Sequence, residues 1–488
     1  MATKLALRGL SRDTRNAPNG TSERIDALVR LVDTLKVARK YEPGWFEEAE
    51  AKIHAQVAEL ERELTAEVIA AHDVDAAYVE IGGKAHRRVL RAEQTYMTLA
   101  GSVTVERWLY RERDDDSAPS LSPLEIRLGM IDFWTPQAAK TATWFVSQMV
   151  PKKAEEAFAR LGGMAPSKSS LDRLPKTMSD RWEVDRETYE AALRDAIVIP
   201  DGAVSVAVSI DGVFAPINGG ANPVAVRNAA AKKGTICKGP AGFREVGCAT
   251  LTFCDASGDA ISSIRAARSP EACKVTLKHT LEADLLAVLR QRPDLTLVKV
   301  ADGVDDNWRF LQNELPDGDE VLDFFHACEH LQLAVAAAYG PSTLETRHRF
   351  EELRHVLLED KNGVARAIRA LDYLRKKHPQ RKDIRLCAAY FRKHRHRMNY
   401  AALRGKNLPI GSGLVEAACK TLVSQRLKLS GMRWGRGAQA ILTLRGWDQS
   451  ERFDEAWALL AAAHHVEVHI LAKIVPFETA KSTRARAG

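Results

Sequence analysis

The sequence predicts an α/β domain with a mixed five-stranded sheet, preceded by a mainly helical N-terminal region and interrupted by an all-helical block. Strand-like apolar segments begin at about residue 203 and alternate with amphipathic helices up to about residue 330. The pattern then becomes helical for roughly seventy residues, until a Gly-Ser-Gly breaker at 411–413 precedes a last helix. A chain of 488 residues is too long for one hydrophobic core, so about two to four domains are expected.

The composition is that of an ordinary globular protein, with 45% hydrophobic and 28% charged residues. The net charge of +7 suits a polyanionic partner without requiring one. The seven cysteines are scattered without a Cys-x-x-Cys pair, which argues against a disulfide framework or a zinc ribbon. The first residues lack the apolar core of a signal peptide, and no run of about 18 apolar residues occurs. A soluble, cytoplasmic protein is therefore expected.

Residues 22–200 are predicted to form the mainly helical region, after a polar and disordered tail at 1–21. The run 92–113 alternates apolar and polar residues across a Gly-Ser turn, which indicates a small hairpin. Residues 136–183 are predicted to form three short helices, with a glycine pair between the second and the third. This spacing fits a helix-turn-helix, and it fits a plain helical bundle equally well.

The α/β domain is assigned element by element. The segment 203–216, AVSVAVSIDGVFAP, is a strongly apolar strand. The segment 248–268 contains two strands around an Asp-Ala-Ser-Gly turn, and 270–292 is an amphipathic helix opened by a proline. TLVKVADG (296–303) and EVLDFF (320–325) are further strands, with a short helix between them.

The order of these elements is three strands, a helix, a strand, a helix and a strand, followed by a helical block and a final helix. This is the order of an RNase H-like domain with an insertion before its last helix. The domain is expected in two parts, at 203–330 and 408–447, with the helical insertion at 331–405. A helical tail is expected at 448–488.

Three acidic residues are placed where such a fold could bring them together. Asp211 lies near the middle of the first strand, Asp302 ends the fourth strand, and Glu416 lies one turn into the final helix. In an RNase H-like sheet the first and fourth strands are neighbours and the final helix packs across them. Three converging carboxylates could hold two divalent cations about 4 Å apart for an in-line displacement at phosphorus.

Each of these acids also has an ordinary structural interpretation. An Asp before Gly at a strand end is typical of a turn, and a Glu near a helix start is favoured by the helix dipole. The hypothesis of a catalytic triad therefore depends on the three residues occurring on the right elements in the right order.

The motif DFFHACEHL (323–331) is the next group with chemical potential. Asp323 and His326 could orient a phosphate or a metal-bound water beside the triad, with His330 as a further auxiliary residue. His326 and His330 are one helical turn apart with Cys328 between them, yet only two of these three would share a face. No zinc is therefore expected, and buried hydrogen-bonded histidines are the alternative.

Basic segments flank the predicted site at 227–239, 380–400 and 424–437. Cations mixed with aromatic residues fit phosphate contacts and base stacking, although a charge run is most often a solvated face. The residues that we predict to contact DNA are Lys232, Lys233, Arg392, Lys393, Arg395, Arg397, Lys420, Arg426, Lys428, Arg433 and Trp434.

Several of these motifs together resemble one family. The matching segments are SIDGV, REVGCATLTFCD, ARSPEACKVTLKHTLEADL, VADGVDDNWRFL, VLDFFHACEHL and GSGLVEAACKTLVSQRLKLSGMRW. They look like bacterial insertion-sequence transposases of the ISKra type, which are distantly related to Mutator-like transposases. The resemblance covers about 200–447, with some support from LGMIDFWTP at 128–136. Some relatives carry a Cys-x-x-Cys after the upstream hairpin, and this sequence has none there.

The resemblance implies an RNase H-like DDE catalytic domain with Asp211, Asp302 and Glu416 as catalytic and metal-binding residues. It implies that two Mg²⁺ or Mn²⁺ ions serve cleavage of transposon ends and strand transfer, and that the family's Asp/Cys-x-x-His motif falls on Asp323 and His326. Terminal inverted repeats and target DNA would be the partners of a homodimer or larger assembly, with the N-terminal region binding DNA ends. The alternatives are an RNase H-like nuclease or resolvase, and an inactive transposase-derived DNA-binding protein.

Overall fold

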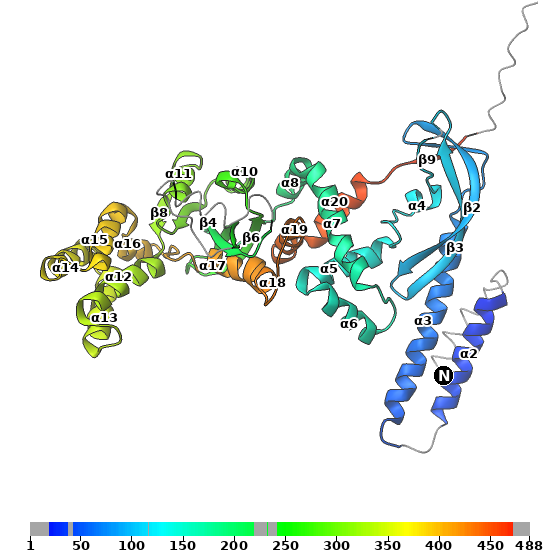
Figure 1. The fold of residues 1–488 in the computed structure, drawn as a ribbon, viewed down its shortest axis with the longest axis horizontal. Helices are drawn as coiled ribbons and strands as arrows, with labels where there is room; N and C mark the ends of the chain where they lie inside the picture. The colour runs from blue at the N-terminus through cyan, green and yellow to red at the C-terminus, as the bar shows by residue number, and fades with distance from the viewer. Residues whose placement is uncertain (1–18, 38–41, 116, 219–231, 233–241, 472–488) are drawn as a thin grey trace, which may run out of the picture. The chain divides into compact units, whose positions relative to one another are not determined.

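The computed structural model describes residues 19–37, 42–115, 117–218, 232 and 242–471 (Figure 1). The expected disordered tail at 1–21 lies outside these residues, apart from positions 19–21, which belong to a helix. By its internal contacts the chain divides into two compact units, one formed by 1–174 with 460–488 and the other by 175–459. In the described part of the chain, no helix has the length and apolar character needed to cross a membrane.

The first unit begins with the two amphipathic helices that the sequence predicts, α2 (Asn19–Lys36) and α3 (Trp45–Ala71). They pack against each other, and the hydroxyl of Thr21 donates a hydrogen bond of 2.7 Å to the carboxylate of Glu67. Arg24 adds ion pairs to Glu59 and Glu63.

The small hairpin of the prediction is part of a larger sheet. Its strands β2 (Lys84–Thr98) and β3 (Gly101–Glu112) are long, and the sheet has the order β3-β2-β1-β9 with β1 at Tyr78–Ile81 and β9 at Val468–Ile470. The prediction of a wholly helical tail at 448–488 was therefore wrong at β9, because this short strand takes its conformation from pairing with β1 rather than from a local pattern.

Short helices follow the sheet along the chain. They are α4 (Pro123–Arg127), α5 (Pro136–Gln148), α6 (Pro151–Leu161) and α7 (Lys168–Val184). The first three begin with proline at the first turn, where its missing N–H and fixed φ are tolerated. Three helices within 136–183 agree with the prediction.

The second unit is built on a mixed five-stranded sheet of order β6-β5-β4-β7-β8. Its strands are β4 (Ser205–Ala215), β5 (Arg244–Cys254), β6 (Ala260–Arg268), β7 (Thr296–Ala301) and β8 (Asp319–Leu322). The pairs β4–β5 and β5–β6 are antiparallel, whereas β7 is parallel to both β4 and β8. The predicted order of elements is confirmed, and the first and fourth strands are neighbours.

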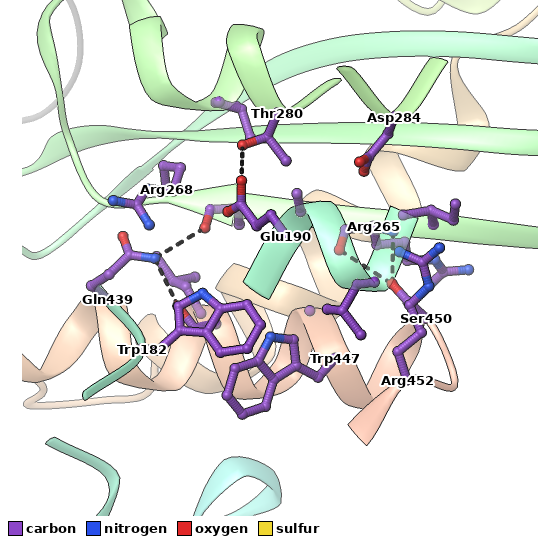
Figure 2. Close-up of a pocket in the computed structure, with 18 residues that line it drawn as sticks. Trp182, Glu190, Arg265, Arg268, Thr280, Asp284, Gln439, Trp447, Ser450 and Arg452 are labelled. Carbon is purple, nitrogen blue, oxygen red and sulfur yellow. Dashed lines mark hydrogen bonds between the residues drawn. The ribbon is translucent and has the colours of Figure 1, made fainter. Parts of the chain in front are cut away.

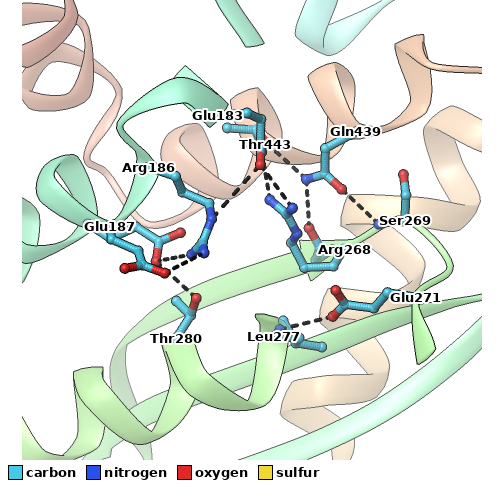
Figure 3. Close-up of polar contacts among 12 residues, drawn as sticks. Glu183, Arg186, Glu187, Arg268, Ser269, Glu271, Leu277, Thr280, Gln439 and Thr443 are labelled. Carbon is cyan, nitrogen blue, oxygen red and sulfur yellow. Dashed lines mark hydrogen bonds and ion pairs between the residues drawn. The ribbon is translucent and has the colours of Figure 1, made fainter. Parts of the chain in front are cut away.

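Helices pack around this sheet. They are α8 (Arg186–Asp195), the short η1 (Ala272–Lys274), α10 (Val275–Gln291), α11 (Asp305–Asn313) and α19 (Gly437–Gln449). The helix α20 (Phe453–Ala463) follows α19 along the chain. Figure 3 shows polar contacts of β6 with α7 and α19, and a contact between α8 and α10. Arg268 of β6 forms a two-pronged ion pair with Glu183 at 2.6 and 3.0 Å, and Glu190 of α8 accepts from Thr280 of α10 at 3.0 Å.

The helical insertion lies between β8 and the final helices. Its members are α12 (Phe324–Tyr339), α13 (Leu344–Glu359), α14 (Gly363–Lys377), α15 (Lys382–His394), η2 (Arg395–Arg397) and α16 (Tyr400–Gly405). It begins at Phe324 and not at the expected residue 331, because Asp323 caps α12 directly after β8. The buried side chains of the insertion and of the sheet form one continuous hydrophobic core.

The chain returns to the sheet through α17 (Gly413–Ala418), which contacts β4 and β5. The helix continues as a π-helical turn, η3 (Cys419–Ser424), and ends in α18 (Gln425–Leu427). Single π-turns inside helices occur often at functional sites. This one lies next to β4, the strand that carries Asp211.

Candidate active site

Asp211 lies within β4, between β5 and β7, and its side chain is half-buried. Its Oδ1 atom accepts a hydrogen bond of 2.7 Å from the N–H of Gly212. Burial raises the pKa of Asp211, and the negative charge of Asp302 raises it further, whereas the bond from Gly212 opposes the shift. The positive charge of Lys274 also opposes the shift, but burial outweighs it.

Asp302 follows β7 directly, on the strand that is parallel to β4. Its Oδ1 atom accepts hydrogen bonds from the N–H of Val304 at 3.1 Å and from the side-chain amide of Asn307 at 3.4 Å. The same amide also donates to the carbonyl of Ile210 at 3.2 Å. Asn307 thus joins the Asp302 turn to the residue before Asp211, which fixes the two acids relative to each other.

The two aspartates line one open cavity of about 950 Å³. Glu245, Lys274 and Asp306 line it as well. Convergence of Asp211 and Asp302 follows from the register of the parallel pair, since Ser209 of β4 lies opposite Val300 of β7 and each aspartate comes two residues later.

Glu416 lies one turn into α17, and its side chain is exposed. The hydroxyl of Ser412 lies 3.0 Å from Glu416 Oε1. Three residues beyond Glu416, the Sγ atom of Cys419 lies 3.9 Å from Oδ2 of Asp211. This contact brings the helical segment that carries Glu416 against the strand that carries Asp211.

Glu416 is nevertheless not among the residues that line the cavity of the two aspartates. Within the described part of the chain, no group of three or more His, Cys, Asp or Glu side chains is arranged to hold a metal ion. The structure therefore brings two of the three predicted acids together and places the third on a neighbouring helix.

Asp323 has a role different from the expected one. Its carboxylate is fully buried. One oxygen accepts from the N–H of His326 at 2.7 Å and so caps α12, while the other accepts from the backbone N–H and the hydroxyl of Ser412. The expectation that Asp323 contacts a phosphate or a metal-bound water was wrong, because both oxygens are occupied in the interior. Asp323 instead ties the start of the insertion to the residue that opens the Glu416 helix.

His326 and His330 contact each other edge to face, with ring centroids 5.0 Å apart. His330 stacks on Tyr390 of α15 at 4.1 Å, and burial lowers the pKa of His330. The Tyr390 ring lies against the backbone of Gly303, the residue after Asp302, where a Cβ would meet it. The hydroxyl of Tyr390 is buried and has no hydrogen-bond partner among the described residues. The insertion therefore reaches the edge of the candidate site.

The residues predicted to contact DNA differ in how exposed they are in the structure. The exposed ones are Lys232, Lys393, Arg395, Lys420, Lys428 and Arg433. Arg392 and Trp434 are partly buried, and Arg392 pairs with Asp372. Lys233 lies outside the described residues.

The predictions that Arg397 and Arg426 contact DNA were wrong, because both side chains are buried. The guanidinium of Arg397 lies 3.8 Å above the Trp308 ring and pairs with Glu320 at 2.7 Å. The guanidinium of Arg426 lies 5.0 Å from the Trp434 ring. The charge pattern could not reveal this, because long basic side chains pack their stems and even their heads on aromatic rings.

Sequence reasoning also missed residues that belong to the site. Asn307 could have been found from its place five residues after Asp302 in VADGVDDN. Lys274, Glu245 and Tyr390 carry no local signal, since only the packing of distant elements brings them to the cavity or its edge.

A second cavity of about 650 Å³ lies elsewhere in the same unit, between β6, α10 and α19. Figure 2 shows two tryptophans, Trp182 and Trp447, together with the buried Asp284 in its lining. None of the three predicted catalytic acids lines it.

No family model matches the chain, and no curated protein sequence matches it. The resemblance to ISKra-type transposases therefore stays a prediction from the motifs.

Proposed function

We propose that this chain is a DNA transposase of the DDE type, in which Asp211, Asp302 and Glu416 perform cleavage of transposon ends and strand transfer. The observation that carries the proposal is that Asp211 and Asp302, on adjacent parallel strands, line one cavity. The strand order of the sheet and the insertion before the final helices support an RNase H-like core.

The acidic side chains at the candidate site are of the chemical type that binds divalent cations. Carboxylate oxygens are the ligands that Mg²⁺ and Mn²⁺ prefer, and the pKa of Asp211 is raised by burial and by the neighbouring charge of Asp302, which a bound cation would offset. When bound, two such ions would supply the activation of the attacking oxygen and the stabilisation of the departing one. Asp211 and Asp302 line the same cavity, and Glu416, on the helix whose Cys419 contacts Asp211, would be the third ligand.

The remaining parts of the chain have roles in this proposal. Asn307 holds the Asp302 turn against β4, while Asp323 and Ser412 hold the start of α17. The exposed cations would contact the DNA backbone, which is recognised mainly through charge. The helices α5 to α7 would contribute to end binding, and a homodimer or larger assembly would provide one active site for each transposon end.

The decisive experiment mixes the purified protein with Mg²⁺, a supercoiled target, and DNA that ends in the sequences flanking its coding region. Cut ends joined to target are expected from the wild type. Asp302→Asn should abolish both reactions, since losing a metal-bridging carboxylate costs several kcal/mol of transition-state stabilisation. Asp294→Asn is the matched control, because Asp294 is an exposed aspartate just before the opposite end of β7.

The outcomes separate the alternatives. Cut ends without joined products would favour an RNase H-like nuclease or resolvase. DNA binding without any Mg²⁺-dependent cleavage would favour an inactive transposase-derived DNA-binding protein. Full activity of Asp302→Asn would refute the catalytic assignment.

A further inference from the structure

An ion pair lies over the sheet beside Asp211. The ammonium of Lys274 lies 2.9 Å from Oε1 of Glu245 and 3.4 Å from the side-chain oxygen of Asn307. The Lys274 side chain is only 14% exposed, whereas Glu245 is 43% exposed. Both line the cavity that holds Asp211 and Asp302, so a largely buried cation borders the candidate active site.

Two glycines make room for this pair. Gly212 and Gly247 lie directly opposite each other in β4 and β5. A Cβ on Gly212 would collide with the carboxylate of Glu245, and a Cβ on Gly247 would lie 3.4 Å from the stem of Lys274 and 2.8 Å from Leu277. The bare patch of sheet beside Asp211 is therefore filled by the Glu245–Lys274 pair.

The backbone that carries Lys274 is strained. Cys273 and Lys274 are consecutive non-glycine residues with φ values of 53° and 54°. The left-handed region costs such residues on the order of 1–2 kcal/mol each. Lys274 is the residue directly before α10, and the carboxylate of Glu271 accepts the N–H of Leu277 in the first turn of this helix at 3.0 Å. Strain of this kind persists where surrounding structure enforces it, and it concentrates at functional sites.

The charge balance of the cavity indicates a role for the ammonium of Lys274. Asp211, Asp302, Glu245, Glu271 and Asp306 all line it, and among its described lining residues Lys274 alone is a cation. A phosphodiester that approached the two aspartates would meet strong repulsion from these carboxylates. An ammonium within the cavity offsets that repulsion and can bind a phosphate oxygen as a point charge.

We propose that Lys274 is a phosphodiester-binding residue of the active site, and that Glu245 holds its ammonium until a DNA phosphate replaces the carboxylate as its partner. This inference rests on the proposed function, since it names the group that binds the DNA backbone beside the two aspartates. In this proposal the absence of side chains at Gly212 and Gly247 leaves space for the DNA phosphate to replace the Glu245 carboxylate.

A small probe isolates this contact from the rest of the DNA-binding surface. The dinucleotide thymidylyl-(3′→5′)-thymidine carries a single phosphodiester, and its binding in the presence of Ca²⁺ is measured by phosphorus NMR titration. Inorganic phosphate is titrated in parallel, because a general anion site would bind it at least as well as the diester.

Removing the charge of Lys274 and removing the charge of Glu245 should change dinucleotide binding in opposite directions. Lys274→Gln should weaken dinucleotide binding about tenfold, as expected for loss of a charged hydrogen bond. Glu245→Gln should strengthen it, because the ammonium no longer has a competing carboxylate, and the double variant should behave as Lys274→Gln. Lys274→Arg should restore part of the affinity. Lys406→Gln removes the same charge from an exposed lysine that pairs with Asp319, and neither residue lines the cavity, so this variant should leave binding close to wild type.

A purely structural ion pair predicts a different pattern. Equal losses in Lys274→Gln and Glu245→Gln, unchanged binding in Lys274→Gln, or no dinucleotide binding by the wild type would each overturn the inference. Stronger binding of inorganic phosphate than of the dinucleotide would overturn the assignment to DNA. The variants can also show these opposite effects on dinucleotide binding while the wild type neither cuts nor joins DNA. In that case the proposed function fails and the phosphodiester site stands.

Discussion

The Sγ atom of Cys419 lies 3.9 Å from Oδ2 of Asp211, so the helix that carries Glu416 touches the strand that carries the first aspartate. A hydrogen bond with Cys248, together with burial, raises the pKa of Cys419, and the thiol stays neutral beside the carboxylate. A neutral neighbour at this point allows α17 to approach Asp211 without adding a further negative charge.

From this relationship we expect Glu416→Gln to lower the rate of Mg²⁺-dependent cleavage by about 10³-fold or more, since one ligand of the ions is lost. The stability of the fold should change by less than about 0.5 kcal/mol, because the side chain is exposed. Thermal unfolding with and without Mg²⁺ provides an independent readout, in which the variant should lose part of the stabilisation by Mg²⁺. Cleavage by Glu416→Gln at the wild-type rate would remove Glu416 from the site.

A second prediction concerns Gly303 and Tyr390. A Cβ at Gly303 would collide with the Tyr390 ring, whose Cζ it would approach to 3.0 Å. Gly303→Ala should therefore destabilise the protein by about 1–3 kcal/mol, the usual cost of overpacking. Tyr390→Ala has its own cost, but in the double variant the clash is gone, so a double-mutant cycle in urea should show favourable coupling above about 0.5 kcal/mol. Additive effects would mean that the two residues do not press on each other.

Asp284 provides a prediction on pH. Burial raises its pKa from 3.8 to about 6, although Arg452 and Arg194 oppose the shift. The folded protein therefore binds this proton more tightly than the unfolded chain does. Its contribution to stability is fully present below about pH 4 and is lost as the pH rises through 6, by about 3 kcal/mol in all.

The measurement compares Asp284→Asn with the wild type in thermal or urea unfolding between pH 4 and 7. The variant has no carboxyl to ionise, so its stability relative to the wild type should rise across this range and level off above it. Asp294→Asn is the control, because the hydrogen bond from Arg292 lowers the pKa of Asp294, so the contribution of this carboxylate is lost only below about pH 4 and the difference from the wild type should stay nearly constant across the range. A constant difference between Asp284→Asn and the wild type at all pH values would contradict the assignment.

The fourth prediction separates buried from exposed arginines in one basic segment. Arg397→Gln should destabilise the fold by about 2–3 kcal/mol, because it removes the buried arginine partner of Glu320 and uncovers Trp308. Arg395→Gln should change stability by less than about 0.5 kcal/mol, since Arg395 is exposed.

DNA binding should show the reverse order. Fluorescence anisotropy with a labelled duplex at several salt concentrations should show that Arg395→Gln lowers the salt dependence by about one phosphate contact. Arg397→Gln should leave that slope unchanged at temperatures where it is folded. An unchanged slope in Arg395→Gln would remove this residue from the DNA-binding surface.

Sequence alone determined the elements of the sheet and the order in which they occur. The strands that carry Asp211 and Asp302 are strongly apolar and local in pattern, and their boundaries agree with the structure. Glu416 also lies in the helix where it was expected. These features depend on hydrophobic periodicity and on breakers such as glycine, which act over a few residues and can be recognised in the chain itself.

Tertiary structure alone decided what each polar side chain does. Asp323 becomes a buried tether rather than a site residue, Arg397 an interior cation, and Lys274 a neighbour of Asp211. Each outcome depends on contacts between segments far apart in the chain, as the strand β9 depends on β1. The same charged residue type can cap a helix, stack on a ring or border a cavity, and only the packing of distant elements selects among these states.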